Sequence, residues 1–202
     1  LKNIIAAVAL SIAIIVLYTL FFAPSPEEMK QNRIKQEQVQ KDSDTPSVDQ
    51  NENFVKINRS EALAENNRIE FENNDVVGSI SLKGAIIDDL TFKKYNVVLN
   101  GKEKVVLLSP RKVQNGYFVE SGFVTTNKNI EIPNSSTLWE ISGNKKLTKN
   151  NPIKLTWKNP QGISFEKKIS LDDQFLFTVK EKVINSTDKT YSFYSYAQII
   201  RN

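Results

Sequence analysis

The chain has 202 residues, carries 27 Lys and Arg against 23 Asp and Glu, and contains neither Cys nor His. These two absences exclude imidazole bases, thiol nucleophiles, disulfides, and metal sites built on His or Cys. Any catalysis would therefore have to rest on carboxylates, Lys, Tyr or Ser.

An uncharged apolar run opens the chain and covers residues 4–23. About 20 apolar residues suffice for a helix to cross the hydrocarbon core of a bilayer. The run is longer than the apolar region of a cleavable signal peptide, and Pro26 follows the nearest pair of small residues. We therefore predict an uncleaved transmembrane signal-anchor helix over residues 1–23. Lys2 precedes the run and acidic residues follow it, which places the N-terminus in the cytoplasm and the residues after 23 outside.

The next segment, residues 24–66, is polar, lacks Gly and holds more acidic than basic side chains. A segment with so few apolar residues buries too little surface to offset its conformational entropy. We therefore expect a disordered, flexible polar tether between the anchor and the rest of the protein.

The remaining residues, 67–202, alternate between apolar and polar side chains, which is the period of strands with one buried face. The apolar positions of this pattern are Ile69 and Phe71, Ile80 and Leu82, Ile153, Leu155 and Trp157, Phe175, Phe177 and Val179, and Tyr191 and Phe193. Turn signals recur between these segments, and the pairs Asn100–Gly101 and Asn115–Gly116 are typical of hairpin turns. Roughly ten short strands at this spacing favour an all-β sandwich or barrel.

The basic charge of the chain belongs to this last part. Lys outnumbers Arg, and the basic residues are dispersed along the sequence as isolated pairs. Nucleic-acid footprints instead cluster on one face, often with aromatic residues that stack on bases. We predict no nucleic-acid partner, and we interpret the charge as a solvated surface with a weak attraction to anionic lipids.

Two adjacent carboxylate pairs, Asp88–Asp89 and Asp172–Asp173, are the close acidic pairs of residues 67–202. A glycosidase needs two carboxylates that face one cleft, whereas adjacent residues of a strand point to opposite sides. We therefore interpret both pairs as turn or strand-end caps. The sequence predicts no catalytic, cofactor-binding or metal-binding residue.

Four aromatic residues are the candidates for a contact surface: Trp139, Trp157, Tyr194 and Tyr196. Aromatic side chains also dominate the cores of β-sandwiches, so core packing is the competing interpretation. Tyr194 and Tyr196 share one strand face, opposite Phe193, which indicates that some of these rings lie on an outer or cleft surface.

Three motifs carry a resemblance to a known family: VVGSISLKGAIIDDLTFKKY over 76–95, VVLLSP over 105–110 and YFVESGF over 117–123. Together with the layout of anchor, tether and β-domain, they resemble the start of the large periplasmic domain of the YidC family of membrane protein insertases. The resemblance implies a β-supersandwich fold, an inner-membrane location and an accessory role that needs no catalysis and no cofactor. The membrane helices that perform insertion in this family are not matched. Because the chain stops directly after an apparent strand over 191–200, we expect the β-domain to be C-terminally incomplete.

The resemblance further implies that the intact protein assists the insertion and folding of inner-membrane proteins, alone or with the Sec translocon. The partners expected on this basis are the lipid bilayer, nascent membrane proteins and Sec translocon components. Two alternatives stay open from the residues alone: a membrane-tethered, mutarotase-like carbohydrate-binding sandwich, and an envelope scaffold protein. The lack of His weighs against mutarotase chemistry, which needs a general acid and a general base.

Overall fold

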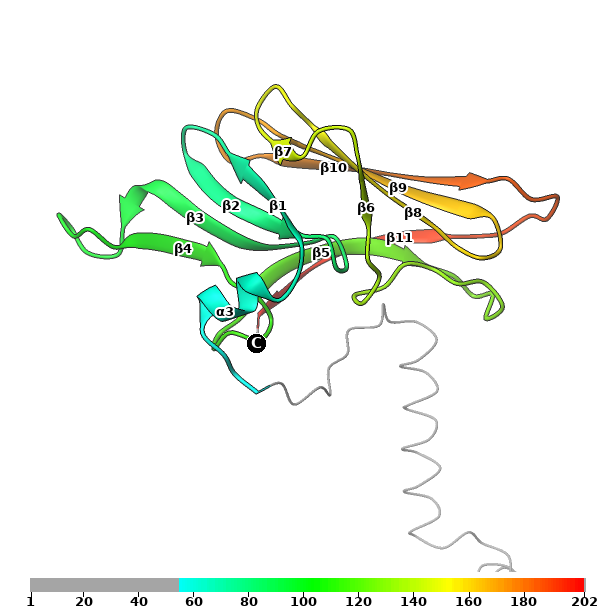
Figure 1. The fold of residues 1–202 in the computed structure, drawn as a ribbon, viewed down its shortest axis with the longest axis horizontal. Helices are drawn as coiled ribbons and strands as arrows, with labels where there is room; N and C mark the ends of the chain where they lie inside the picture. The colour runs from blue at the N-terminus through cyan, green and yellow to red at the C-terminus, as the bar shows by residue number, and fades with distance from the viewer. Residues whose placement is uncertain (1–54, 202) are drawn as a thin grey trace, which may run out of the picture. The chain divides into compact units, whose positions relative to one another are not determined.

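The structure of the protein is a computed structural model that describes residues 55–201 (Figure 1). The predicted signal-anchor helix over 1–23 and most of the predicted tether lie outside these residues. Within the described range, no helix is long and apolar enough to cross a bilayer.

One helix and eleven strands make up the described part of the chain. The helix, α3 (Arg59–Ala64), comes first. It is followed by β1 (Arg68–Glu72), β2 (Val76–Ser81), β3 (Ile86–Asn96), β4 (Lys104–Leu108) and β5 (Tyr117–Val124). The remaining strands are β6 (Glu140–Ser142), β7 (Lys146–Leu147), β8 (Ile153–Lys158), β9 (Ile163–Leu171), β10 (Phe177–Asn185) and β11 (Tyr194–Arg201).

The strands form two sheets, which Figure 1 shows as two layers. The larger sheet has the order β11-β5-β3-β2-β1-β7, with β4 paired to β3, and the smaller sheet has the order β10-β9-β8-β6. Strand pairs are antiparallel, apart from the short parallel pair of β1 with β7. The prediction of a mostly β domain is therefore confirmed, with two sheets as its architecture.

The hydrophobic core is built from the inward-facing residues of both sheets. Ile69 and Phe71 in β1 are fully buried, and so are Leu155 in β8 and Phe165 in β9. The ring of Phe165 lies 5.4 Å from that of Phe123 in β5, so the two sheets meet through aromatic contacts. Burying one such side chain stabilises the fold by roughly 1.5–3 kcal/mol, and the alternating pattern supplies many of them.

Two of the predicted alternating segments begin outside the strands. Phe175 precedes β10 and is 47% exposed, because the carboxylate of Asp172 holds this stretch in a turn. Tyr191 and Phe193 precede β11. The ring of Phe193 nevertheless packs edge-on against Phe165 at 5.6 Å, so its apolar character reflects a core contact rather than strand pairing.

Helix α3 lies within the range predicted for the flexible tether. Asn58 caps the helix by accepting a hydrogen bond from the backbone N–H of Glu61 at 2.9 Å, and Ala62 is buried. The backbone N–H of Ile57 donates to the carbonyl oxygen of Lys112 at 3.1 Å. A cap, a buried residue and this long-range bond order a stretch whose composition alone is that of a tether.

The two Asn–Gly pairs form turns as predicted, since φ is 62° at Asn100 and 57° at Asn115. A different glycine, Gly78 in β2, is required by packing. A Cβ atom at this position would overlap the backbone carbonyl of Asp89 in the neighbouring strand β3. The approach of β2 to β3 at this point therefore depends on glycine.

Candidate functional site

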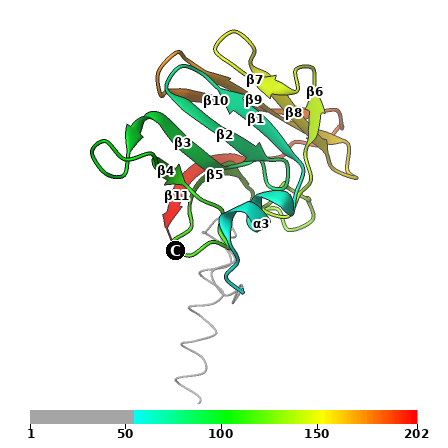
Figure 2. The ribbon, with the colours of Figure 1, turned by 60° about the vertical axis from the view of Figure 1, so that its left-hand side comes forward.

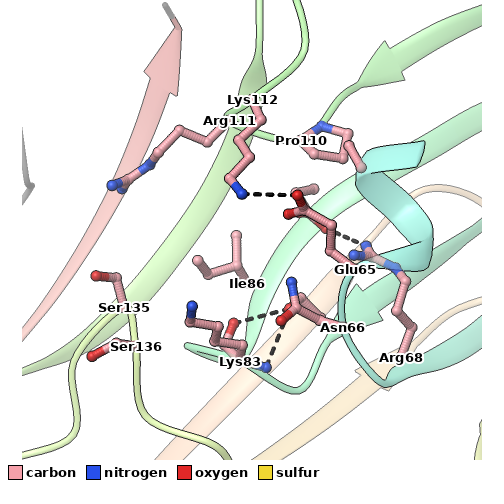
Figure 3. Close-up of a pocket in the computed structure, with 13 residues that line it drawn as sticks. Glu65, Asn66, Arg68, Lys83, Ile86, Pro110, Arg111, Lys112, Ser135 and Ser136 are labelled. Atoms are coloured by element: carbon pink, nitrogen blue, oxygen red, sulfur yellow. Dashed lines mark hydrogen bonds and ion pairs between the residues drawn. The ribbon is translucent and has the colours of Figure 1, made fainter. Parts of the chain in front are cut away.

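A polar pocket of about 440 Å³ lies where α3 packs against the larger sheet (Figure 3). Figure 2 shows α3 at this end of the sheet, below β1 and β2. Its lining comes from α3 and the residues after it, from β1, β2 and β3, from the β4–β5 connection and from the loop before β6. The lining residues are Ala62, Glu65, Asn66, Arg68, Ser81, Lys83, Ile86, Asp88, Pro110, Arg111, Lys112, Ser135 and Ser136. It thus gathers residues that are far apart in the sequence.

A buried ion pair between Arg68 and Asp88 forms one wall of the pocket. Both side chains are 11% exposed. Arg68 also donates from Nε to the hydroxyl of Ser79 at 2.7 Å, so it joins β1, β2 and β3. Burial raises the pKa of the Asp88 carboxyl, and the adjacent guanidinium opposes that rise. The charge of Asp88 is therefore tolerated only because Arg68 faces it.

The neighbouring carboxylate, Asp89, belongs to the same network, because the Ser79 hydroxyl that accepts a hydrogen bond from Arg68 donates one to Asp89. It is ion-paired with Arg59 of α3 and accepts a hydrogen bond from the hydroxyl of Ser79 at 2.6 Å. The interpretation of Asp88 and Asp89 as turn or strand-end caps is therefore wrong, because both are buried inside β3. They instead bind the arginines that hold β1 and α3 to this strand. Asp172, in contrast, caps a turn as predicted.

The mouth of the pocket is formed by a more exposed ion pair. Lys112 donates to Glu65 at 2.8 Å, with side chains 39% and 36% exposed. Figure 3 shows Arg111 extending away from Lys112. Its guanidinium lies 5.0 Å from the centre of the Phe118 ring and 3.6 Å from the carboxylate of Glu120.

The chemical capacity of this pocket is limited to polar recognition. Its hydroxyls, amide and charged groups can form hydrogen bonds, and none of its lining residues is aromatic, so it offers no stacking platform for a sugar ring. Among residues 55–201, no group of three or more Asp and Glu side chains lies close enough together to hold a metal ion.

The structure brings together only two of the four aromatic residues predicted as a contact surface. Trp139 is 2% exposed and lines a small cavity between the sheets together with Tyr196. Trp157 is half-buried and packs on Phe165, with ring centres 5.7 Å apart. Tyr194 is 58% exposed on β11. The two tryptophans belong to the core, and whether the tyrosines bind a partner stays a prediction.

A buried lysine dominates the cavity that Trp139 and Tyr196 share. Lys167 in β9 is 1% exposed, lies 5.3 Å above the Trp139 ring, and is 3.3 Å from the Glu181 carboxylate. It also donates to the backbone carbonyl of Ser121 in β5, which links the two sheets. Burial lowers the pKa of the Lys167 ammonium, and Glu181 opposes that effect.

Tyr196 is affected by the same group of charges. Burial, together with the nearby carboxylates of Glu120 and Glu181, raises the pKa of Tyr196 to about 12. The phenol is therefore neutral over the physiological range and can act only as a hydrogen-bonding group.

Sequence reasoning missed Lys167, although a signal for it exists. In β9 the residues Ile163, Phe165, Ile169 and Leu171 occupy the inward positions of the alternating pattern, and Lys167 falls on the same face. A lysine at an inward position must find a partner or lose its charge. The alternation therefore predicts a buried charge at residue 167, and its partners come from strands that no local pattern connects to it.

Comparisons with known proteins identify relatives of this fold. The sequence model of the YidC periplasmic domain family matches residues 68–202. A membrane protein insertase YidC from Pelagibacter ubique is 67% identical over 201 residues, which is 100% of this chain and 36% of that protein. The protein of the same name from Rickettsia prowazekii is 35% identical over 98% of this chain and 35% of its own length. The one from Brucella suis is 33% identical over 99% of this chain and 37% of its own length. The chain therefore spans about a third of the length of the curated relatives it matches.

Proposed function

The chain belongs to the YidC family of membrane protein insertases and contains its periplasmic domain region, and we propose that the intact protein assists the insertion and folding of inner-membrane proteins. The family is one of insertases and not of enzymes, and it implies an inner-membrane protein with a periplasmic domain. We further propose that residues 1–23 anchor the chain with the N-terminus in the cytoplasm, so that the residues after 23 face the periplasm.

The extent of the similarity carries this proposal. The family match begins at Arg68, the first residue of β1, and continues through β11. The Pelagibacter relative matches the whole chain at 67% identity, so the similarity includes the N-terminal apolar run and the polar segment that follows it. Such continuous similarity supports the same arrangement of anchor, tether and β-domain. It also supports a β-supersandwich as the finer description of the two sheets.

The described residues suit an accessory role in that process. Moving an apolar segment from water into lipid makes and breaks no covalent bond, so the domain needs no nucleophile or general base. Its buried charges form ion pairs that hold strands together. We propose that its surface contacts nascent membrane proteins or components of the Sec translocon, with Tyr194, 58% exposed on β11, as the candidate contact residue.

Insertion by the intact protein tests the proposal directly. The full-length protein is reconstituted into vesicles, a small single-span membrane protein is synthesised in their presence, and protease protection of the span is measured. We expect protection to exceed that of empty vesicles, and equal protection would contradict the proposal. A matched variant in which a flexible linker replaces residues 68–201 tests the accessory role, since we expect it to retain part of the insertion activity.

A further inference from the structure

The hairpin of β3 and β4 projects beyond the rest of the larger sheet, as Figure 1 shows. Pairing of β2 with β3 ends where Val76 meets Phe92. Beyond that point the last residues of β3 pair only with β4, up to Asn96 opposite Lys104. The end of the hairpin is therefore a two-stranded ribbon with no other described strand beside it.

The apex of this ribbon carries three consecutive aliphatic residues directly before the Asn100–Gly101 pair. Val97 is 59% exposed, Val98 is 65% exposed and Leu99 is 93% exposed. Turns usually carry Gly, Pro, Asn, Asp or Ser, because those residues fit turn geometry and water. A surface group of large apolar side chains at a turn therefore indicates a function other than folding.

The turn holds these side chains outward in a fixed geometry. The N–H of Val97 donates to the carbonyl of Glu103 at 2.9 Å, and the N–H of Gly101 donates to the carbonyl of Val98, also at 2.9 Å. Asn100 adopts a positive φ of 62° between them. These two bonds give the N–H groups of Val97 and Gly101 partners within the turn itself.

Lysines surround the apex. Lys94, Lys102 and Lys104 are exposed, and Glu103 is the single acidic residue in the stretch 93–104. Among the described residues, Lys102 has no ion pair, whereas Lys94 pairs with Asp75. The ribbon therefore presents an apolar tip behind which positive charge is concentrated.

We propose that this tip, residues 97–99, inserts into the interface of a lipid bilayer that contains anionic headgroups. Apolar side chains at the tip enter the boundary of the acyl chains, while the lysines behind it remain at the depth of the phosphates. A protein groove is the less suitable partner, because interface cores are depleted in lysine and because three aliphatic side chains fall far short of a standard interface. This contact goes beyond the proposed function and does not depend on insertion activity.

The absence of cysteine from the chain allows a clean test. Leu99→Cys is labelled with an environment-sensitive fluorophore in the full chain, which is reconstituted into phosphatidylcholine vesicles with and without phosphatidylglycerol. Nitroxide groups on the lipid chains report contact by quenching the fluorophore. Ser186→Cys, at an exposed position between β10 and β11, carries the same label as a matched control.

We expect a blue-shifted emission and quenching at residue 99 at least about threefold greater than at residue 186, with a larger effect in the anionic vesicles. Adding Val98→Asp should lower the quenching at residue 99 to the control value, and Lys102→Glu with Lys104→Glu should remove the preference for anionic lipid. Equal quenching at residues 99 and 186 would overturn the proposal. So would a blue shift at residue 99 that requires another protein and occurs without quenching by lipid.

Discussion

The same dipeptide occurs twice in this protein and serves two different purposes. Asp88 and Asp89 lie inside β3, where each is buried against an arginine. Asp172 and Asp173 lie in the turn before β10, where Asp172 accepts backbone hydrogen bonds and Asp173 pairs with exposed Lys149 at 2.7 Å.

The difference comes from the surroundings and not from the dipeptide. Opposite Asp88 and Asp89, the fold places Arg68 and Arg59, which are 20 and 30 residues away in the chain. Around Asp172 the partners are its own neighbours in sequence. A local pattern can therefore predict the role of Asp172, whereas the first pair depends on the tertiary fold. The predictions below test this contrast from the largest expected effect to the smallest.

Removing Asp88 should have the largest effect. We expect Asp88→Ala to lower the free energy of unfolding by about 3–5 kcal/mol, because it leaves the buried Arg68 guanidinium without its partner. Urea unfolding followed by tryptophan fluorescence measures this loss. The double variant Arg68→Met with Asp88→Leu should recover most of the stability, because it removes both buried charges together. A double variant as unstable as Asp88→Ala would contradict the ion-pair interpretation.

Removing Asp89 should cost less. Arg59 is 34% exposed, so water can replace the lost carboxylate, and only the hydroxyl of Ser79 loses a buried partner. We expect Asp89→Ala to lower the free energy of unfolding by about 1–3 kcal/mol. Because Arg59 belongs to α3, limited proteolysis should cut residues 55–66 faster in this variant. Unchanged cleavage there would show that the ion pair does not hold α3 to the sheet.

Removing Asp172 should have a smaller effect still. Its carboxylate accepts hydrogen bonds from the backbone N–H groups of Gln174 and Leu176, each at 2.9 Å, in an exposed turn. We expect Asp172→Ala to cost about 1 kcal/mol, and Asp172→Asn to retain most of that stability through its amide oxygen. Thermal unfolding of the two variants side by side checks this order, and equal losses would argue against the cap.

The pH dependence of the stability contribution should have opposite signs for Asp88 and Asp173. Burial raises the pKa of Asp88, so its contribution to stability is full at low pH and is lost as the pH rises through its folded pKa. Lys149 lowers the pKa of Asp173, whose contribution is present above the unfolded value of 3.8 and is lost as the pH falls.

The stability difference between the natural chain and each Asn variant measures this effect. On acidification from neutral pH, we expect the natural chain to gain stability relative to Asp88→Asn. We expect it to lose stability relative to Asp173→Asn. Salt should weaken the second effect more, because Lys149 and Asp173 are exposed. Equal slopes for the two variants would contradict the assigned environments.

The sequence predicts the parts of the fold that depend on local alternation. The segments around Ile69 and Phe71 and around Ile153 to Trp157 are strands because their inward residues form the core. Helix α3 could not be predicted, because its order comes from a cap and from contacts with β3 and the β4–β5 connection. The polar pocket was not predictable for the same reason.

The candidate contact residues show the same limit. An aromatic residue in an alternating strand indicates burial or exposure only when the position of the second sheet is known. Trp139 is covered by the smaller sheet through Lys167, while Tyr194 on β11 is left exposed. Family resemblance in the motifs around residues 76–123 gave the functional class, which no cluster of side chains shows by itself.

The position of the domain relative to the membrane tests the central claim most directly. The full-length protein with Ser186→Cys as its single cysteine is expressed in bacterial cells, which are converted to spheroplasts and treated with a membrane-impermeant maleimide. We predict that residue 186 is labelled in intact spheroplasts to the same extent as after lysis, because the β-domain faces the periplasm. Labelling that appears only after lysis would contradict a periplasmic domain and, with it, the proposed role of this chain in membrane protein insertion.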